Sequence, residues 1–440
     1  MKIIKMNKKI EGFSKLSKKE KIAWIANTHF DFAEEAIAKL ESYWNSDIKL
    51  QKKHDEFIEN TLSNFYLPLG VAPNFIINKV EYTLPIVIEE SSVVAAASNA
   101  AKFWSKRGGF KATVIDTVKS GHVHFIFEGS FIELELFFVK KKSELLKATK
   151  ALTHNMKARG GGIIDIKLID KSGSLKDYYQ LQANFKTADA MGANFINSCL
   201  ECLAEKFKNL VHIEPSFHGK ELDIVMSILS NYVPECLVKA EVSCKIQDLG
   251  PQEGMSATVF AKKIIQAINI ANCEPYRAVT HNKGIMNGVD GLILATGNDF
   301  RAIEAGVHAY AARSGQYRSL SNAKIEKNMF IMDVTLPLSL GTVGGLTKLH
   351  PLVSWSMKLL GNPDAKTLMK IVAVAGLAQN FAALRSLVTS GIQKGHMKMH
   401  LLNILNQFNA NDFQKKSALI YFKTNTVSVN AVDDFLQKKY

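Results

Sequence analysis

The chain of 440 residues has few cysteines: only five, Cys199, Cys202, Cys236, Cys244 and Cys273. A small, odd number disfavours a disulfide framework and is typical of a reducing compartment. Cys199 and Cys202 form one C-x-x-C, but a zinc site of this type needs a second pair at suitable spacing, and the sequence has none. We therefore expect two helix residues that face a core rather than redox or metal chemistry.

Long apolar runs and blocks of like charge are also missing. The longest apolar segment, residues 368–388, contains Lys370, Gln379, Asn380 and Arg385, so we expect no membrane span. The amino terminus carries lysines without a continuous apolar block, which predicts no signal peptide and a cytoplasmic protein. The net charge is +14, but the lysines are spread and no aromatic-interleaved basic motif occurs. This favours a basic surface that attracts anions over a nucleic-acid interface.

The patterns that are present predict a globular protein of two to four domains, with 47% apolar and 22% charged residues. Residues 16–64 and the chain from residue 256 onward have helical patterns. Between them, proline and glycine at 68–73 predict a loop, followed by a short strand over 82–88. A helix over 93–104 follows, begun by Ser91 or Ser92 as cap.

The middle of the chain has the order strand, helix, strand, strand, helix, strand that is typical of a ferredoxin-like domain. The strands are predicted at 117–129, 160–170, 177–186 and 239–248, and the helices at 142–157 and 190–210. We expect an α+β fold of three parts. A mainly helical large domain comprises residues 1–115 and 222–390, a ferredoxin-like domain is inserted at 116–221, and a small mobile helical unit covers 391–440. The final strand of the insertion could extend to about residue 247.

Four ionisable residues stand among small, amide or apolar neighbours: Glu90, Lys283, Asp299 and His396. A carboxyl group in an apolar junction tends to stay protonated, and a lysine near carboxylates stays charged, so such residues could supply a proton donor and a fixed cation. Glu90 could equally be an acid that favours a helix start. His396 and His400 lie four apart without further ligands, so we expect no metal there; His396 is the better candidate for a proton donor on a mobile segment.

The stretch "TADAMGANFINS" places Asp189 before a helix start that is rich in small residues. Gly192 and Ala193 permit close backbone approach, and a helix amino terminus favours an anion. A tight helix entry without any ligand explains the same residues. The pattern is not G-x-G-x-x-G, so a nucleotide would be bound in another way than in a Rossmann fold.

Several motifs in one order give the chain a family resemblance. "ENTLSNFYLPLGVAPNF", "PIVIEESSVVAAAS", "DAMGAN", "HNKGIMNGVDGLILATGND", "GLAQNFAAL" and "GIQKGHMKMH" resemble class II 3-hydroxy-3-methylglutaryl-coenzyme A (HMG-CoA) reductases, over about residues 59–400. The resemblance implies reduction of HMG-CoA to mevalonate and free coenzyme A with two NAD(P)H, through a hemithioacetal and mevaldehyde. It also implies a homodimer, or a multiple of dimers, with the active site near the subunit interface.

The resemblance further implies roles for individual residues. Lys283 would hold the substrate carbonyl and its oxyanion, Asp299 would pair with Lys283, Glu90 would donate the proton in the aldehyde step, and His396 would protonate the departing thiolate. The positions that match substrate contacts are Ser92, Arg277, Asn287, Gln379 and Asn380. The positions that match dinucleotide contacts, in the ferredoxin-like domain, are Asp189, Met191, Gly192 and Asn194.

Cofactor preference and reaction direction are less constrained. Where relatives that prefer NADH have an acid for the adenosine ribose, this chain has Thr153, with His154 beside it. The missing acid favours NADPH over NADH, because an acid there would repel a 2′-phosphate. Three alternatives stay open: the same enzyme oxidising mevalonate, a basic nucleic-acid-binding protein, and an inactive homologue.

Overall fold

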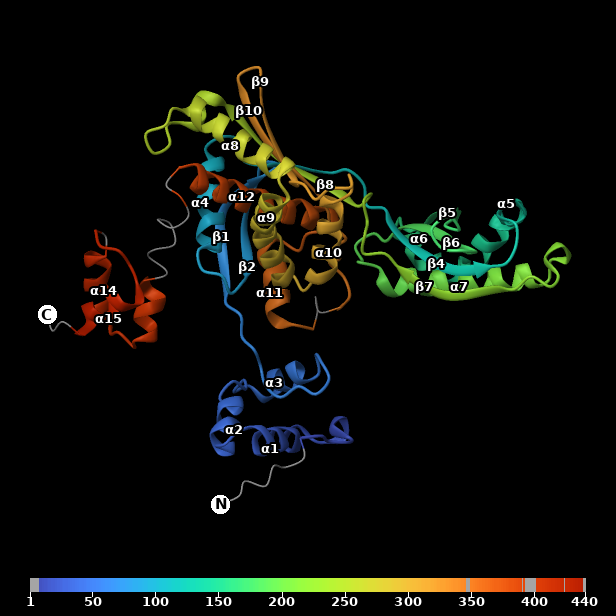
Figure 1. Cartoon of the computed structure of the whole chain (residues 1–440), viewed down its shortest axis with the longest axis horizontal. Helices are drawn as coiled ribbons and strands as arrows, with labels where there is room; N and C mark the ends of the chain where they lie inside the picture. Colours follow the sequence, from blue (N-terminus) through green and yellow to red (C-terminus); the bar gives the residue numbers. More distant parts are fainter. Residues whose placement is uncertain (1–7, 346–348, 390, 392–400, 423, 438–440) are drawn as a thin grey trace. The chain divides into compact units, whose positions relative to one another are not determined.

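The computed structural model describes residues 8–345, 349–389, 391, 401–422 and 424–437. It divides into two compact units. The described residues of the first unit, Met1–Pro68 with Leu349–Pro351, form the helices α1 (Lys18–His29), α2 (Ala33–Glu41) and α3 (Ile48–Asp55), which confirms the helical pattern expected here (Figure 1). A capping box begins α1, because the Ser17 side chain and the Glu20 side chain each accept a backbone N–H of the other residue.

The second unit begins with an antiparallel hairpin of β1 (Leu69–Ile77) and β2 (Val80–Val87). Its turn residues, Asn78 and Lys79, have φ angles of 50° and 71°, as a tight hairpin turn requires. The loop predicted at 68–73 is wrong. Pro73 is tolerated in β1 because it lies where the pairing register shifts, between Ala72 and Phe75, so its missing N–H breaks no regular ladder.

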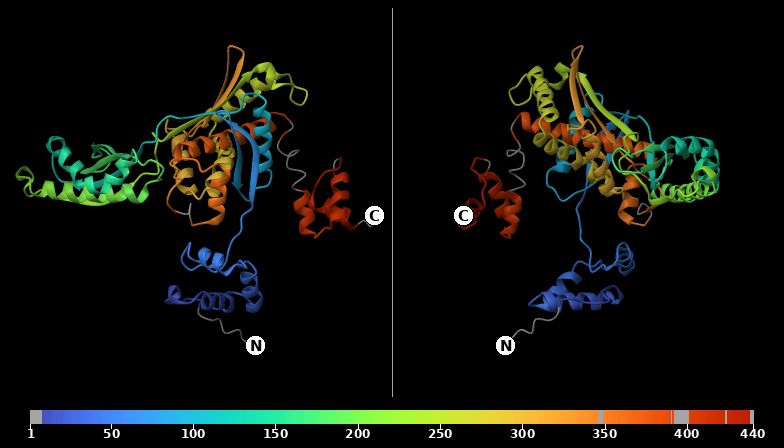
Figure 2. Two further views of the ribbon diagram at one scale, coloured as in Figure 1. Left: turned by 180° about the vertical axis from the view of Figure 1, so that it is seen from behind. Right: turned by 45° about the vertical axis from the view of Figure 1, so that its right-hand side comes forward.

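A second sheet has the strand order β3-β8-β10-β9 and packs against the helices that carry the candidate site. The helical pattern after residue 256 is confirmed for the helices, but it missed the β9–β10 hairpin, which projects beyond the other strands of its sheet (Figure 2). The strands are β3 (Lys111–Val114), β8 (Leu237–Lys245), β9 (Ser321–Glu326) and β10 (Met329–Pro337). The helices are α4 (Val93–Ser105), α8 (Ala257–Cys273), α9 (Pro275–Ala295), α10 (Phe300–Ala311), α11 (Pro351–Leu359) and α12 (Ala365–Val388).

The third sheet has the order β5-β6-β4-β7, all antiparallel, which is the strand arrangement of a split βαβ unit. The predicted order of elements is therefore present, but its last strand was misassigned. Residues 239–248 belong largely to β8, which pairs with β3 and β10, and the sheet is completed by β7 (Leu222–Leu229). The other elements are β4 (Lys119–Phe127), α5 (Phe131–Ala148), α6 (Lys150–Ala158), β5 (Gly162–Asp170), β6 (Tyr178–Lys186) and α7 (Ala193–His212).

Helix α12 is the most deeply buried helix next to the candidate site. By length and composition it could cross a bilayer, but 67% of its most apolar window is buried, as in the core helix of a folded domain. It packs closely on α9, where a Cβ added at Gly288 would lie 2.3 Å from the Ala375 carbonyl oxygen. Glycine at this position lets the two helix backbones approach, and that places polar residues of both helices in one cavity.

The carboxy-terminal part has a small hydrophobic core of its own. A helical segment over 401–407, α14 (Asp412–Tyr421) and α15 (Val429–Gln437) surround it. The buried members are Leu401, Ile404, Leu405, Ala410, Ala418, Phe422, Val432 and Phe435. His396, the predicted proton donor, lies outside the described residues, as does His400.

Candidate active site

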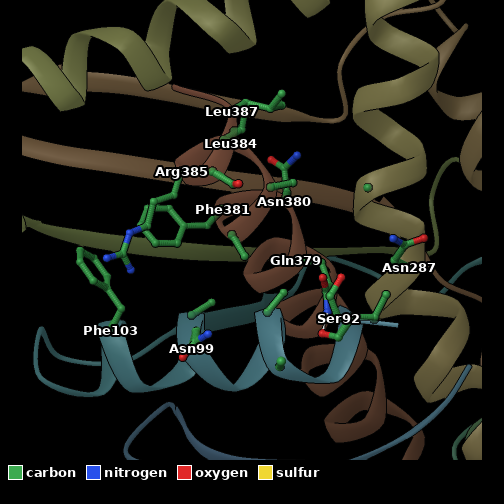
Figure 3. Close-up of a pocket in the computed structure, with 18 of the residues that line it drawn as sticks. Ser92, Asn99, Phe103, Asn287, Gln379, Asn380, Phe381, Leu384, Arg385 and Leu387 are labelled. Carbon is green, nitrogen blue, oxygen red and sulfur yellow. Dashed lines mark hydrogen bonds between the residues drawn. The ribbon is translucent and has the colours of Figure 1, made fainter. Parts of the chain in front are cut away.

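A cavity of about 890 Å³ lies among α4, α9 and α12 (Figure 3). Seven residues singled out from the sequence line it, although they come from three separate stretches of the chain: Glu90, Ser92, Arg277, Lys283, Asn287, Gln379 and Asn380. The fold therefore gathers all the predicted substrate-contact residues and two of the four predicted catalytic residues in one place.

Glu90 and Lys283 form an ion pair at this cavity. Glu90 follows β2 just before α4, and Lys283 lies in the middle of α9; the distance from Nζ to Oε2 is 2.5 Å. The side chains keep 58% (Lys283) and 38% (Glu90) of their surface exposed, so both can be reached from the cavity. Lys283 has no acidic neighbour in the sequence, and its acidic partner in the fold, Glu90, lies 193 residues earlier in the chain.

Asp299 does not pair with Lys283 within the chain. It caps α10, where its carboxylate accepts the backbone N–H groups of Arg301 and Ala302, and it pairs with the Arg301 guanidinium at 3.2 Å. Burial raises the pKa of Asp299, but these hydrogen bonds lower it overall, so the group is a stable anion. The separation follows from the helix: Ala295, the last residue of α9, lies twelve positions after Lys283, which is about 18 Å along the helix axis at 1.5 Å per residue.

Arg277, Lys283 and Asn287 all project from α9 into the cavity wall. Arg277 is half-buried in the first turn, and burial lowers the pKa of its guanidinium. Among the described residues it has no carboxylate within ion-pair distance, so its fork of donors is available to a carboxylate ligand.

Two amides of α12 complete this wall. The Gln379 side chain donates to the Val93 carbonyl at 2.6 Å, which ties α12 to the start of α4. Ser92 is the N-cap residue of α4, as predicted, but its backbone is left-handed with φ 74° and its side chain makes no cap hydrogen bond to the helix. In Figure 3, Ser92 and Gln379 lie next to each other at one end of the cavity.

His281 was missed by sequence reasoning. It is 2% exposed, and its Nε2 lies 2.7 Å from the Ser321 hydroxyl and 3.2 Å from the Asn380 amide nitrogen. Burial and the neighbouring Arg277 charge lower the pKa of His281 to about 3, so this imidazole is neutral and cannot act as a proton donor at neutral pH. Its contacts join Asn380 of α12 to Ser321 of β9. The only signal in the sequence that could have indicated His281 is its position four residues, or one helical turn, after Arg277.

The other end of the cavity is basic and was also missed. Four cations line it: Lys102, Lys106, Arg107 and Arg385. The Arg107 and Arg385 guanidinium groups lie 3.7 Å and 5.0 Å from the ring centre of Phe103, and Arg385 extends towards that ring in Figure 3. Burial and the Arg107 charge lower the pKa of Arg385, and the Glu253 carboxylate, which also lines this cavity, acts in the opposite direction. Two like charges on one ring are a suitable receptor for a polyanion.

The predicted dinucleotide residues lie away from this cavity, at the start of α7. Gly192 is the helix N-cap with φ 96°, and a Cβ there would lie 2.5 Å from Thr187 Cγ2, so only glycine fits. The Asp189 carboxylate accepts the backbone N–H of Ala365 at 2.9 Å, and Asn194 is exposed in the first turn. Because no side chain caps α7, its first N–H groups can receive the phosphates of a dinucleotide.

The two residues considered for the adenosine end differ in accessibility. Thr153 is 1% exposed, and its hydroxyl donates to the Lys150 carbonyl, so its side chain faces the core and cannot contact a cofactor. This corrects its assignment as a cofactor residue; the buried stripe of α6 explains why threonine stands there. His154 is exposed on the same helix.

The fold is a mixture of helices and sheets, and at its cavity a lysine paired with a glutamate lies near a half-buried arginine and a group of further cations, as in an enzyme that acts on an anionic substrate. The comparisons agree with this class. The hydroxymethylglutaryl-coenzyme A reductase family model matches residues 17–401. The chain is 37% identical over 404 residues to the 3-hydroxy-3-methylglutaryl-coenzyme A reductase of Archaeoglobus fulgidus, covering 91% of this chain and 87% of the relative. It is 35% identical to a probable reductase of Borreliella burgdorferi, over 85% of both chains.

Solved structures from Streptococcus pneumoniae are similar as well. A class II 3-hydroxy-3-methylglutaryl-CoA reductase bound to NADPH in open conformations has a TM-score of 0.71 and 37% identity, covering 86% of this chain and 99% of that one. A second structure of that enzyme has a TM-score of 0.72 and 35% identity, covering 97% and 99%. The chain belongs to the HMG-CoA reductase family, in its class II, and is an oxidoreductase.

Proposed function

We propose that this chain reduces the thioester of HMG-CoA to mevalonate and free coenzyme A with two NAD(P)H, through a hemithioacetal and mevaldehyde. The observation that carries the proposal is the Glu90–Lys283 pair at the cavity wall, on the same helix as the available guanidinium of Arg277. The pair supplies a cation and a proton carrier, and the guanidinium supplies a receptor for the free carboxylate of the substrate.

The residues support the two reductive steps as follows. When bound, the reduced nicotinamide supplies hydride to the substrate carbonyl carbon. The carbonyl oxygen then gains negative charge, which the Lys283 ammonium stabilises in place. In the first step the carbon–sulfur bond of the hemithioacetal breaks, the aldehyde forms, and the thiolate takes a proton from His396. In the second step hydride from the second NAD(P)H reaches the aldehyde carbon and the aldehyde oxygen becomes an alkoxide. This alkoxide takes its proton from the Glu90 carboxyl group, after that group has taken up a proton from solvent, so mevalonate leaves as the alcohol.

Substrate orientation follows from the two ends of the cavity. Arg277 binds the carboxylate of the hydroxymethylglutaryl group with both fork donors, with Ser92 and Asn287 beside it. Lys102, Arg107 and Arg385 receive the phosphates of coenzyme A at the basic end. Among the described residues, Glu253 is the one acid beside the four cations at this end, so their net positive charge favours a phosphate-bearing ligand.

We infer that the active site is completed by a second subunit. Asp299 is fixed at the start of α10, after the end of α9, and is therefore too far from Lys283 of the same chain to pair with it. It can pair with this lysine only if Lys283 comes from a second copy of the chain. Mixing Lys283→Ala and Asp299→Ala chains, each inactive alone, would then restore about a quarter of wild-type activity. The reason is that about half of randomly paired dimers hold both variants, and each of these has one complete site. No recovery after mixed refolding would refute the shared site.

The α7 start is proposed as the dinucleotide site, with NADPH favoured over NADH, because α6 exposes His154 and Lys157 and no acid in this stretch. The direct test is the consumption of NADPH and NADH by the wild-type chain on addition of HMG-CoA. We expect turnover with both and a higher kcat/KM with NADPH. No consumption of either reductant, by protein that is folded by circular dichroism, would refute the proposed function. We further propose a cytoplasmic enzyme.

A further inference from the structure

Lys119 is a buried lysine beneath the start of α7. It is the first residue of β4, and only 4% of its surface is exposed. Its ammonium donates three hydrogen bonds: to Thr187 Oγ1 at 2.7 Å, to the Ala190 carbonyl at 2.9 Å and to the Met191 carbonyl at 2.8 Å. Among the described residues no carboxylate lies within ion-pair distance of it. Lysine is almost never fully buried without a charged partner, so this arrangement needs a reason other than packing.

The three acceptors belong to the segment that leads into α7. In a planar trans peptide the carbonyl and the following N–H point in opposite directions. Because Lys119 holds the Met191 carbonyl, the Gly192 N–H is directed away from the ammonium. The Thr187 hydroxyl also donates to the Ala190 carbonyl at 2.6 Å, which closes the segment around the lysine.

We propose that Lys119 is a positioning residue for the dinucleotide: it fixes residues 187–192 in the shape that presents the first N–H groups of α7 to the phosphates. Its positive charge also lies under that helix start, where it adds to the attraction for an anion. The inference rests on the proposed function, since it takes this segment as the dinucleotide site. It adds a residue outside the "DAMGAN" motif, 70 positions before Asp189 in the sequence.

The charge state of Lys119 gives the wild-type chain a signature of this role. Burial lowers the pKa of Lys119 to about 8, so the third donor hydrogen and the charge are lost at mildly alkaline pH. The buried thiol of Cys236 is the titratable group whose charge affects the pKa of Lys119. The Asp116 carboxylate in turn raises the pKa of that thiol. Burial raises the pKa of Cys236 to about 11, so the thiol stays neutral while Lys119 titrates.

The test measures the Kd of NADPH from nicotinamide fluorescence, together with KM for NADPH and for HMG-CoA, in Lys119→Met. The matched control is Lys167→Met, the same change at an exposed position of β5 in the same sheet. We expect the Lys119 variant to raise the Kd and KM for NADPH at least about tenfold, equivalent to ~1.4 kcal/mol, and to leave KM for HMG-CoA within about twofold. The control should match the wild type. In the wild type and the control, the Kd of NADPH should rise from pH 7 to pH 9, and in Lys119→Met this rise should disappear.

Thr187→Val serves if Lys119→Met does not fold, because it removes one acceptor of the ammonium and keeps the lysine. It should raise the Kd of NADPH in the same direction, and the wild-type pH profile needs no variant. An unchanged NADPH affinity in a folded variant, or an equal rise of KM for both substrates, would overturn the inference. If the wild type oxidises no NADPH with HMG-CoA yet binds it through Lys119, the function is wrong and the positioning role stands.

Discussion

Replacing Lys283 by methionine tests whether its ion pair with Glu90 acts in catalysis or only stabilises the fold. The pair with Glu90 is short, 2.5 Å, but 58% of the lysine side chain is exposed. Exposed pairs contribute about 0.2–1 kcal/mol to stability, because water screens them. Loss of one preorganised donor to an oxyanion costs about 3–4 kcal/mol of transition-state stabilisation, or roughly 10²–10³ in kcat. We therefore expect a nearly unchanged melting temperature and a kcat reduced by at least about 10²-fold.

The chain offers a matched control for this change. Lys324 and Glu326 form a pair at 2.6 Å with 62% and 53% of their side chains exposed, outside the cavity. Lys324→Met should have the same small effect on thermal unfolding and no effect on NADPH oxidation. If Lys283→Met kept kcat within about tenfold of the wild type, or lost activity only because it unfolded, the role assigned to this lysine would be wrong.

Two further predictions concern stability. Burial and the neighbouring Glu304 carboxylate raise the pKa of Asp290 to about 8, well above its value in the unfolded chain. The contribution of Asp290 to the free energy of unfolding is therefore present at low pH and is lost as the pH rises through about 8. Asp290→Asn should therefore stabilise the chain more at pH 9 than at pH 5 in thermal unfolding, and equal shifts at both pH values would contradict the assignment. Gly288→Ala should destabilise by about 1–3 kcal/mol through overpacking against Ala375, whereas at Gly284 the nearest atom to an added Cβ is 3.9 Å away. In denaturant titrations Gly284→Ala should be neutral or stabilising, and equal effects of the two alanines would show that the close approach of α9 and α12 is unimportant.

Motif order was the most informative feature of the sequence. It led to the family and to seven residues that the fold places around one cavity. The sequence was less informative about which strands belong to the same sheet. Residues 239–248 alternate like any half-buried strand, and only hydrogen bonding to β3 and β10 shows that they leave the inserted domain. The loop predicted at 68–73 failed for a related reason, because a register shift in β1 accommodates a proline that ordinarily ends a strand.

The residues that sequence reasoning missed act through distant contacts. His281 acquires its neutral state from burial beside Asn380, 99 residues away, and Lys119 acquires its role from carbonyls about 70 residues further along. Thr153 shows the opposite error: a position chosen by alignment with a motif turned out to face the core.

The linear order of residues was sufficient to determine the chemistry that this chain can perform, because an ammonium, a carboxyl group and a guanidinium keep their properties wherever the chain carries them. Which groups meet was decided only in three dimensions. Lys283 pairs with Glu90 and not with Asp299, although Asp299 is much closer in the sequence. The reason is that Asp299 follows the end of α9, and the helix separates that end from Lys283. Burial, which sets the pKa of His281 and of Lys119, likewise exists only after the helices and sheets have packed.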